Sequence, residues 1–214
     1  MDITLAHALT RRRSVRAFAK HAIPLRSLEK ILWAGQGKSG EDDGRTVPSA
    51  HALYPLRLFV MASRVDGLDS GLYAAEPGGL DLRNINHADL RPALCKAAIG
   101  HPEWIANAAC IIAICADMLT PVRAFVEQQP YGARGERYIF LEAGAAAQNI
   151  QLMAVAEGLG SVLVGGFNDE ATASVLGLAP PLAPVALMCL GARFLSADEA
   201  RRHRRHTTHN ALTR

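Results

Sequence analysis

The spacing of apolar residues changes along this chain, and each spacing predicts a different element of secondary structure. Between positions 25 and 34 apolar residues recur every three or four positions, which predicts a helix, and Gly35 and Gly37 predict its end. The polar, glycine-rich stretch 36–44 is then expected to form a loop. A shorter helix-like run lies close to the N-terminus, just before a cluster of arginines.

Four short apolar runs predict β-strands, at residues 56–62, 109–116, 161–164 and 184–190. The run 109–116 is rich in β-branched residues and carries no charge, which is typical of a strand covered on both faces. The sheet that these strands form should therefore have helices on each side.

The longest predicted helix covers residues 136–157. Apolar and small residues lie almost all round it, so we expect it to be buried on every side, in part by a second subunit. Shorter surface helices are expected at 88–97 and 171–176. Helices mixed with a few strands, without strict alternation, predict an α+β layered domain.

The composition fits one globular domain with a sizeable core, since the chain has 214 residues of which 50% are hydrophobic and 20% charged. We expect this domain to cover residues 1–195 and a basic tail to cover 196–214. The surplus of apolar residues favours a subunit interface, and hence a homodimer.

The net charge of +3 belongs to the tail. Residues 201–214 contain five arginines and no acidic residue, so subtracting five from +3 leaves −2 for the rest of the chain. A nearly neutral body argues against a nucleic-acid partner. The tail is expected to be a disordered or partner-wrapping extension, and its three histidines do not make a convincing metal site, so no metal is predicted.

The four cysteines form no C-x-x-C pair, and three of them lie in apolar runs, which predicts buried, reduced thiols. Arginines interrupt the N-terminal region before any long apolar stretch, so a signal peptide is not expected. The uncharged stretch 143–156 is too short to span a bilayer. These features predict a soluble, cytoplasmic protein without a membrane segment.

The N-terminal arginine cluster reads Arg12-Arg13-Ser14-Val15-Arg16. Arginine side chains match phosphate oxygens in a bidentate way, and a serine hydroxyl adds a further donor. The cluster could therefore hold a single phosphate group. The alternative is a solvated basic end of a helix.

Several further motifs follow this cluster along the chain. They are the run 45–55 after the glycine-rich loop, Gln148-Asn149-Ile150, Gly158-Leu159-Gly160, Val164-Gly165-Gly166-Phe167 and Gly191-Ala192-Arg193. In this order they resemble the FMN-dependent nitroreductase family, over residues 11 to 193. Within that family, the run 131–138 and its continuation to Asn149 are most similar to the azoline-dehydrogenase (SagB-type) branch.

The resemblance implies a nitroreductase-like fold, in which a central, mostly antiparallel sheet is flanked by helices and two chains form an intertwined homodimer with shared active sites. It implies FMN as the cofactor and NAD(P)H as the electron donor. The phosphate of FMN would be held by the N-terminal cluster and the last arginine motif, that is, by Arg12, Arg13, Ser14, Arg16 and Arg193.

The flavin ring and ribityl chain would meet other motifs of the family. Pro48, Ser49 and Ala50 would reach them from the second subunit, and Ala52 would lie nearby. Val164, Gly165 and Gly166 would line the ring near N5, where a backbone N–H stabilises the reduced flavin. A tight turn after a strand is the alternative interpretation of the two glycines.

The sequence departs from the family pattern at three positions. His51 replaces a glycine that the azoline-dehydrogenase branch usually has, and Ala52 stands where many nitroreductases carry an asparagine. Pro130 replaces the lysine of a Lys-Tyr pair, whereas Tyr131 is kept and is the candidate catalytic residue. The loss of that lysine argues against oxidation of peptide azolines.

No acid–base motif such as G-x-S-x-G or H-E-x-x-H occurs, and Glu142 and Glu157 are interpreted as structural. The leading hypothesis is an FMN-dependent oxidoreductase that passes hydride from NAD(P)H to a small acceptor such as a nitroaromatic, quinone or enone. The alternatives are a flavin-dependent oxidase or dehydrogenase of a peptide or metabolite, and a flavin-binding protein without turnover.

Overall fold

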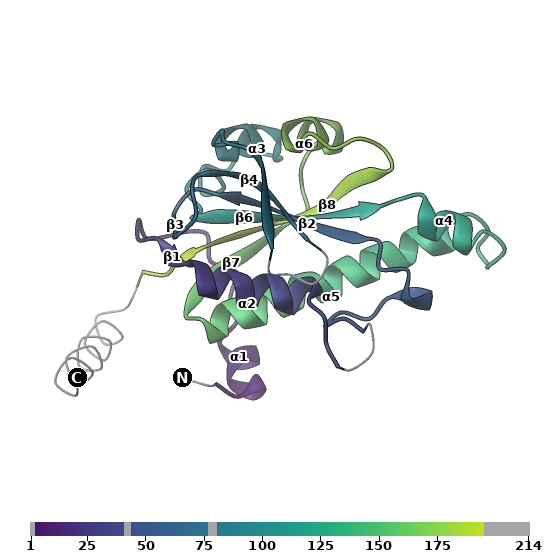
Figure 1. Cartoon of the computed structure of the whole chain (residues 1–214), viewed down its shortest axis with the longest axis horizontal. Helices are drawn as coiled ribbons and strands as arrows, with labels where there is room; N and C mark the ends of the chain where they lie inside the picture. The colour runs from purple at the N-terminus through teal and green to yellow at the C-terminus, as the bar shows by residue number, and fades with distance from the viewer. Residues whose placement is uncertain (1–2, 41–43, 77–80, 195–214) are drawn as a thin grey trace.

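A computed structural model describes residues 3–40, 44–76 and 81–194 of the chain. Its centre is a six-stranded sheet with the strand order β5-β4-β2-β6-β8-β7, in which every pair of neighbours is antiparallel (Figure 1). The strands are β2 (Leu56–Ala62), β4 (Gly71–Ala75), β5 (Leu82–Asn86), β6 (Cys110–Asp117), β7 (Leu159–Val164) and β8 (Leu182–Ala192). The predicted basic tail, 196–214, lies outside the described residues.

Helices cover both faces of the sheet, as predicted (Figure 1). On one face lie α2 (Leu25–Gln36) and α5 (Arg134–Ala156), with α1 (Leu5–Arg11) packed on α5. On the other face lie α3 (Arg91–Ala97) and α6 (Asp169–Leu176). The short α4 (Thr120–Ala124) packs near the start of α5, and β1 (Ile23–Pro24) pairs in parallel with β3 (Val65–Asp66) beside the main sheet.

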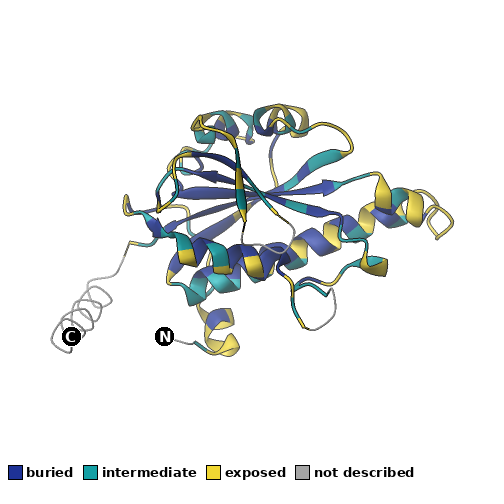
Figure 2. Ribbon diagram, in the orientation of Figure 1, coloured by how far each residue is buried: buried dark blue, intermediate teal, exposed yellow. Residues whose placement is uncertain are grey.

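Strand β6 is the centre of the core, and the expectation that both of its faces are covered is confirmed (Figure 2). Ile112 and Ile114 pack with residues of α2 and α5, whereas Ile111 packs with residues of α3 and α6. All three isoleucines have no exposed surface. Side chains of a strand point alternately to the two faces of the sheet. Strand β6 therefore contributes to the hydrophobic cluster on each face.

Helices α2 and α5 approach each other closely because α2 carries a glycine at the contact. A Cβ built on Gly35 would lie only 3.0 Å from Cδ1 of Ile150. The glycine that sequence analysis assigned to the end of α2 therefore lies inside the helix, which ends at Gln36. Gly37 follows as the cap residue, and its N–H donates to the carbonyl of Trp33.

Within this single chain helix α5 is buried on one side, and the expected burial of its other side by a second subunit stays a prediction. One face packs on the sheet and on α2, but Phe140 and Leu141 are 51% and 63% exposed (Figure 2). Among the described helices, α5 alone is long and apolar enough to cross a bilayer by length and composition, and nearly half of that stretch is buried within the chain. Core helices of this length share that composition, so the feature is weak evidence for a membrane span.

The four cysteines are free and buried, as predicted. Burial raises the pKa of the Cys110 and Cys115 thiols to about 12 and also raises the pKa of Cys189.

Since the thiolate is the reactive form, these three thiols should resist alkylation by iodoacetamide in the folded protein and react fully in guanidinium. Mass spectrometry of peptides tests this expectation, and labelling of any of the three before unfolding would contradict it. Cys95, 8% exposed, is the one most open to reagent.

Candidate active site

The segment that follows α1 lies against the start of β7 and the end of β8. Ser14 forms a parallel bridge with Ser161, and the N–H of Val15 donates to the Ser161 carbonyl at 2.9 Å. The N–H of Ala19 donates to the carbonyl of Ala192, also at 2.9 Å. These hydrogen bonds bring the N-terminal arginine cluster next to the last residues of the sheet.

A pair of facing glycines makes this approach possible. Gly160 of β7 pairs with Gly191 of β8. A Cβ on Gly160 would lie 2.8 Å from Cγ1 of Val15 and 3.1 Å from Cγ of Arg193, and a Cβ on Gly191 would lie 2.8 Å from the ring of Phe18. The two glycines therefore leave the space that the N-terminal segment fills.

Arg16 of the N-terminal cluster and Arg193 of the last motif both line one groove of about 1430 Å³ at this end of the sheet. The guanidinium of Arg16 lies 5.8 Å from the ring centroid of Trp104, a cation–π distance. Neither arginine forms an ion pair with a carboxylate of the described residues. Two arginines without carboxylate partners in one groove fit an anionic group such as a phosphate.

The other members of the N-terminal cluster lie beside this groove and do not line it. Arg12 caps the C-terminal end of α1. The guanidinium of Arg13 donates to the carbonyls of Thr10 at 3.0 Å and Arg12 at 2.7 Å, so it is engaged by the end of that helix. Ser14 is exposed at the bridge with Ser161. In this chain Arg16 is the residue of the cluster that shares the groove with Arg193.

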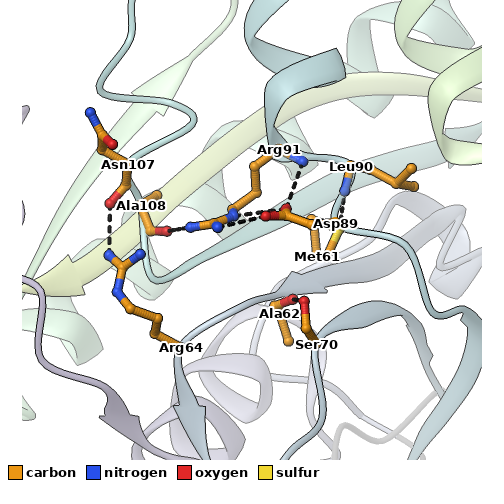
Figure 3. A network of polar contacts seen from close by, with 9 residues as sticks. All are labelled: Met61, Ala62, Arg64, Ser70, Asp89, Leu90, Arg91, Asn107 and Ala108. Atoms are coloured by element: carbon orange, nitrogen blue, oxygen red, sulfur yellow. Dashed lines mark hydrogen bonds and ion pairs between the residues drawn. The ribbon is translucent and has the colours of Figure 1, made fainter.

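A network of arginines supports the wall of the groove that carries Trp104 (Figure 3). Arg64 lines the groove and donates to the carbonyl of Asn107 at 2.8 Å. Arg91 donates to the carbonyl of Ala108 at 2.6 Å and pairs with Asp89 at 2.6 Å. The hydrogen bond from Arg91 holds the pKa of Asp89 below its usual value. The network therefore fixes the loop between α3 and β6 against the rest of the chain.

Val164, Gly165 and Gly166 lie at the other end of β7, which is an edge strand of the sheet. Because the carbonyl of Ser161 points outward to Val15, the alternation of a strand points the backbone groups of Leu163 toward the same free edge. Gly165 and Gly166 follow directly after the last residue of β7.

Neither of these glycines is required by the backbone or by packing. The residues with φ in the left-handed region do not include Gly165 or Gly166, so the alternative of a tight turn that needs glycine is not supported. A Cβ on Gly165 would meet nothing within 4 Å, and one on Gly166 would make only an ordinary contact with Ile99. The exposed surface at Gly165 is therefore open to a ligand or to a second chain.

The predicted ring-binding loop lies against the first half of α5. The N–H of Ala50 donates to Oε1 of Glu142 at 2.8 Å, and the hydroxyl oxygen of Ser49 accepts from the N–H of Tyr54, also at 2.8 Å. His51, the residue that departs from the branch pattern, packs its ring edge-on against Phe125 at 4.9 Å. Pro48 and Ala52 are exposed.

Tyr131 is 66% exposed and precedes α5, whereas Glu157 follows α5 and lines the arginine groove. Helix α5 has 23 residues and is therefore about 35 Å long. A single chain thus holds Tyr131 far from the groove. The predicted residues form separate groups in one subunit: the arginine groove at the start of β7, the two glycines after its end, the loop at Ser49, and Tyr131.

Sequence reasoning missed Trp104 and treated Glu142 as structural. No local sequence motif predicts a role for Trp104, because its partner Arg16 comes from a distant part of the chain. The position of Glu142 in the sequence could have indicated a functional role, since it lies within the run that resembles the azoline-dehydrogenase branch. Its contact with Ala50 could not be inferred without the fold.

Replacing Gly160 with alanine should weaken flavin binding, because the new Cβ would press on Val15 and on the stem of Arg193. We expect the dissociation constant of FMN to rise about tenfold, the effect of losing about 1.4 kcal/mol. Titration by flavin fluorescence measures it. Ser174→Ala is the control, since Ser174 is exposed on α6, on the opposite face of the sheet from α5. Equal losses in both variants would show that the contact at Gly160 is irrelevant.

An antiparallel sheet between two helical layers, with an arginine groove at the start of its edge strand, defines the nitroreductase class of α+β folds. The chain belongs to the nitroreductase family, since the model of that family matches residues 9–192. It is 35% identical, over 193 residues, to a Methanocaldococcus jannaschii protein named as a nitroreductase, which covers 90% of this chain and 93% of the relative.

Solved structures agree with this assignment. A nitroreductase structure from Ralstonia eutropha matches 92% of this chain and 86% of its own, with a TM-score of 0.76 and 25% identity. One from Anabaena variabilis matches 89% of this chain but only 38% of its own, with a TM-score of 0.73 and 27% identity. The Escherichia coli microcin synthetase complex, solved with truncated pro-MccB17 bound, contains a chain with the same fold: its TM-score is 0.71 at 21% identity, over 91% of this chain and 74% of that one.

The family and the fold together identify a flavin-dependent oxidoreductase, so the predicted family and fold class are confirmed. The azoline-dehydrogenase branch stays a prediction.

Proposed function

We propose that the protein is an FMN-dependent oxidoreductase that takes hydride from NAD(P)H and reduces a small acceptor, such as a nitroaromatic, quinone or enone. The observation that carries the proposal is that Arg16 and Arg193 line one groove at the start of β7, the strand that Gly165 and Gly166 follow. The groove suits the phosphate of FMN, and the open edge at Gly165 suits its ring.

In this proposal the bound FMN supplies the hydride chemistry, and the protein supplies position and electrostatics. Arg16 and Arg193 hold the phosphate, with Arg12, Arg13 and Ser14 close by. Val164, Gly165 and Gly166 border the ring, and a backbone N–H of the two glycines is the donor near N5.

The remaining predicted residues complete the site from a second chain. Pro48, Ser49, Ala50 and Ala52 approach the ring across a homodimer interface, which explains why one chain holds them apart from the groove. Tyr131 would lie near the substrate in the same way and would donate a proton or a hydrogen bond. The exposed apolar residues of α5 provide the surface for this interface. We also propose that the protein is cytoplasmic and that its thiols are reduced. Neither a metal ion nor a nucleic acid takes part in the proposed function.

Steady-state oxidation of NADPH and NADH, with menadione or nitrofurazone as acceptor, tests the activity. Turnover that requires both the nucleotide and the acceptor supports the proposal. Consumption of oxygen driven by a peptide or metabolite, without nicotinamide, would favour the oxidase alternative. Bound flavin that none of these reagents turns over would favour a carrier or sensor.

The cofactor released from the purified protein should be FMN and not FAD. The chain offers one compact phosphate site and has no G-x-G-x-x-G turn for a pyrophosphate. Heat release followed by chromatography against both standards identifies the flavin. Recovery of FAD would contradict the expectation.

A further inference from the structure

The loop between Ser49 and Tyr54 adopts an unfavourable backbone conformation. His51, Ala52 and Tyr54 have φ values of 52°, 53° and 46°, in the left-handed region that residues other than glycine rarely occupy. Such conformations persist only where surrounding contacts impose them, and they gather at functional sites. The contacts that hold this loop therefore bear on the function of the site that it serves.

Glu142 of α5 is the contact at the base of the loop. Its Oε1 accepts the N–H of Ala50 at 2.8 Å, and the hydroxyl of Ser49 also hydrogen-bonds to its carboxyl group. Ser49 in turn accepts the N–H of Tyr54 at 2.8 Å. One side chain of the helix thus controls both the start of the loop and, through Ser49, its end.

The environment of Glu142 is unusual for a residue that serves folding alone. The side chain is only 7% exposed, and its Oε2 is buried without a hydrogen-bond partner among the described residues. Burial raises the pKa of Glu142, against the opposing effect of the hydrogen bonds from Ala50 and Ser49. A buried carboxyl oxygen without a donor is destabilising, so its presence calls for a compensating role.

We propose that Glu142 is a positioning residue of the flavin site, which holds Ser49 and Ala50 at the base of the strained residues 51–54 and so presents this loop to the flavin ring. The inference rests on the proposed function, because the loop contacts flavin only in that account. Glu142 acts through the loop and does not touch the cofactor itself, since its side chain is sealed beneath Ser49 and Ala50.

The test compares Glu142→Ala and Glu142→Gln with the matched control Tyr73→Phe. Tyr73 is also a buried polar side chain that anchors a loop, since its hydroxyl donates to the carbonyl of Asp69 at 2.9 Å, but it lies on β4 and does not line the arginine groove. For each variant we would measure the thermal midpoint of the flavin-free protein, the dissociation constant of FMN and the visible spectrum of bound flavin.

Glu142→Ala should raise the FMN dissociation constant at least tenfold and shift the visible band, because the loop leaves its strained conformation. Glu142→Gln keeps an oxygen for the Ala50 N–H and should restore affinity to within about threefold of wild type. Tyr73→Phe should lower the thermal midpoint, because it removes the hydrogen bond to Asp69, without changing affinity or spectrum. If Glu142→Ala does not fold, Glu142→Asp, whose carboxylate cannot reach Ala50, replaces it with the same expected direction.

A Glu142→Ala protein that is destabilised like Tyr73→Phe, but binds FMN with wild-type affinity and spectrum, would overturn the assignment and leave the proposed function intact. Failure of the wild-type protein to bind FMN would overturn both.

Discussion

Replacing Arg193 with alanine should raise the dissociation constant of FMN by roughly tenfold to hundredfold, the effect of losing a charge-assisted contact of about 1.5–3 kcal/mol. Arg193 shares the groove with Arg16 and has no carboxylate partner among the described residues, so its charge is free for a phosphate. Replacing Arg12 should act in the same direction. Because neighbouring arginines can compensate for one another, the double variant Arg12→Ala with Arg16→Ala should lose more than either single variant.

Arg83→Ala is the matched control for these variants. Its side chain is 67% exposed and pairs with Glu76 at 3.5 Å on the surface, far along the sheet from the groove. Its removal should leave FMN affinity within twofold of wild type. Fluorescence titration at fixed ionic strength compares all the proteins. Wild-type affinity in both the Arg193 variant and the double variant would show that the phosphate lies elsewhere.

Introducing charge on the exposed face of α5 should convert the protein to a monomer and abolish flavin binding. Phe140 and Leu141 are 51% and 63% exposed in a single chain, and large apolar residues exposed side by side mark interaction surfaces. In the double variant Phe140→Asp with Leu141→Asp, two carboxylates would have to be desolvated for two chains to associate, which is strongly unfavourable. Since the proposed site needs Ser49 and Ala50 of a second chain, the monomer should lose most of its FMN.

Light scattering coupled to gel filtration measures the mass, and the visible spectrum of the eluted protein reports bound flavin. Ile85→Asp is the control, because Ile85 is 44% exposed on β5, at the opposite edge of the sheet from β7. That variant should stay dimeric and yellow. A wild-type protein that is monomeric and loaded with flavin at micromolar concentration would contradict the shared site.

Local sequence patterns predicted the elements that form the core but not those that depend on distant partners. The bounds of β2 matched the apolar run 56–62, and β6 was displaced by one residue. Strand β8 extends beyond the predicted run 184–190 at both ends, because pairing with β6 and β7 continues there. Strands β4 and β5 were missed, since β4 is a short run of five residues and polar residues interrupt the pattern of β5; pairing of β4 with β2, and of β5 with β4, stabilises them.

In the candidate site, too, the sequence predicted which residues matter but not the contacts that depend on distant parts of the chain. The sequence motifs named Arg16 and Arg193 as partners through family resemblance, and the packing at Gly160 supplies the physical reason that they meet. The motifs could not tell that Arg13 is engaged by the end of α1, nor that Trp104 faces Arg16. They also could not tell that a single chain keeps Tyr131 at the far end of α5, because that separation follows from the length and direction of one helix.

The most direct test of the central claim is the visible spectrum of the FMN-loaded protein during anaerobic addition of NADPH and then of menadione. The account predicts that the flavin absorbance bleaches with about one equivalent of NADPH per chain and returns when the quinone is added. A protein that binds no FMN, or whose bound FMN stays oxidised with both NADPH and NADH, would contradict it.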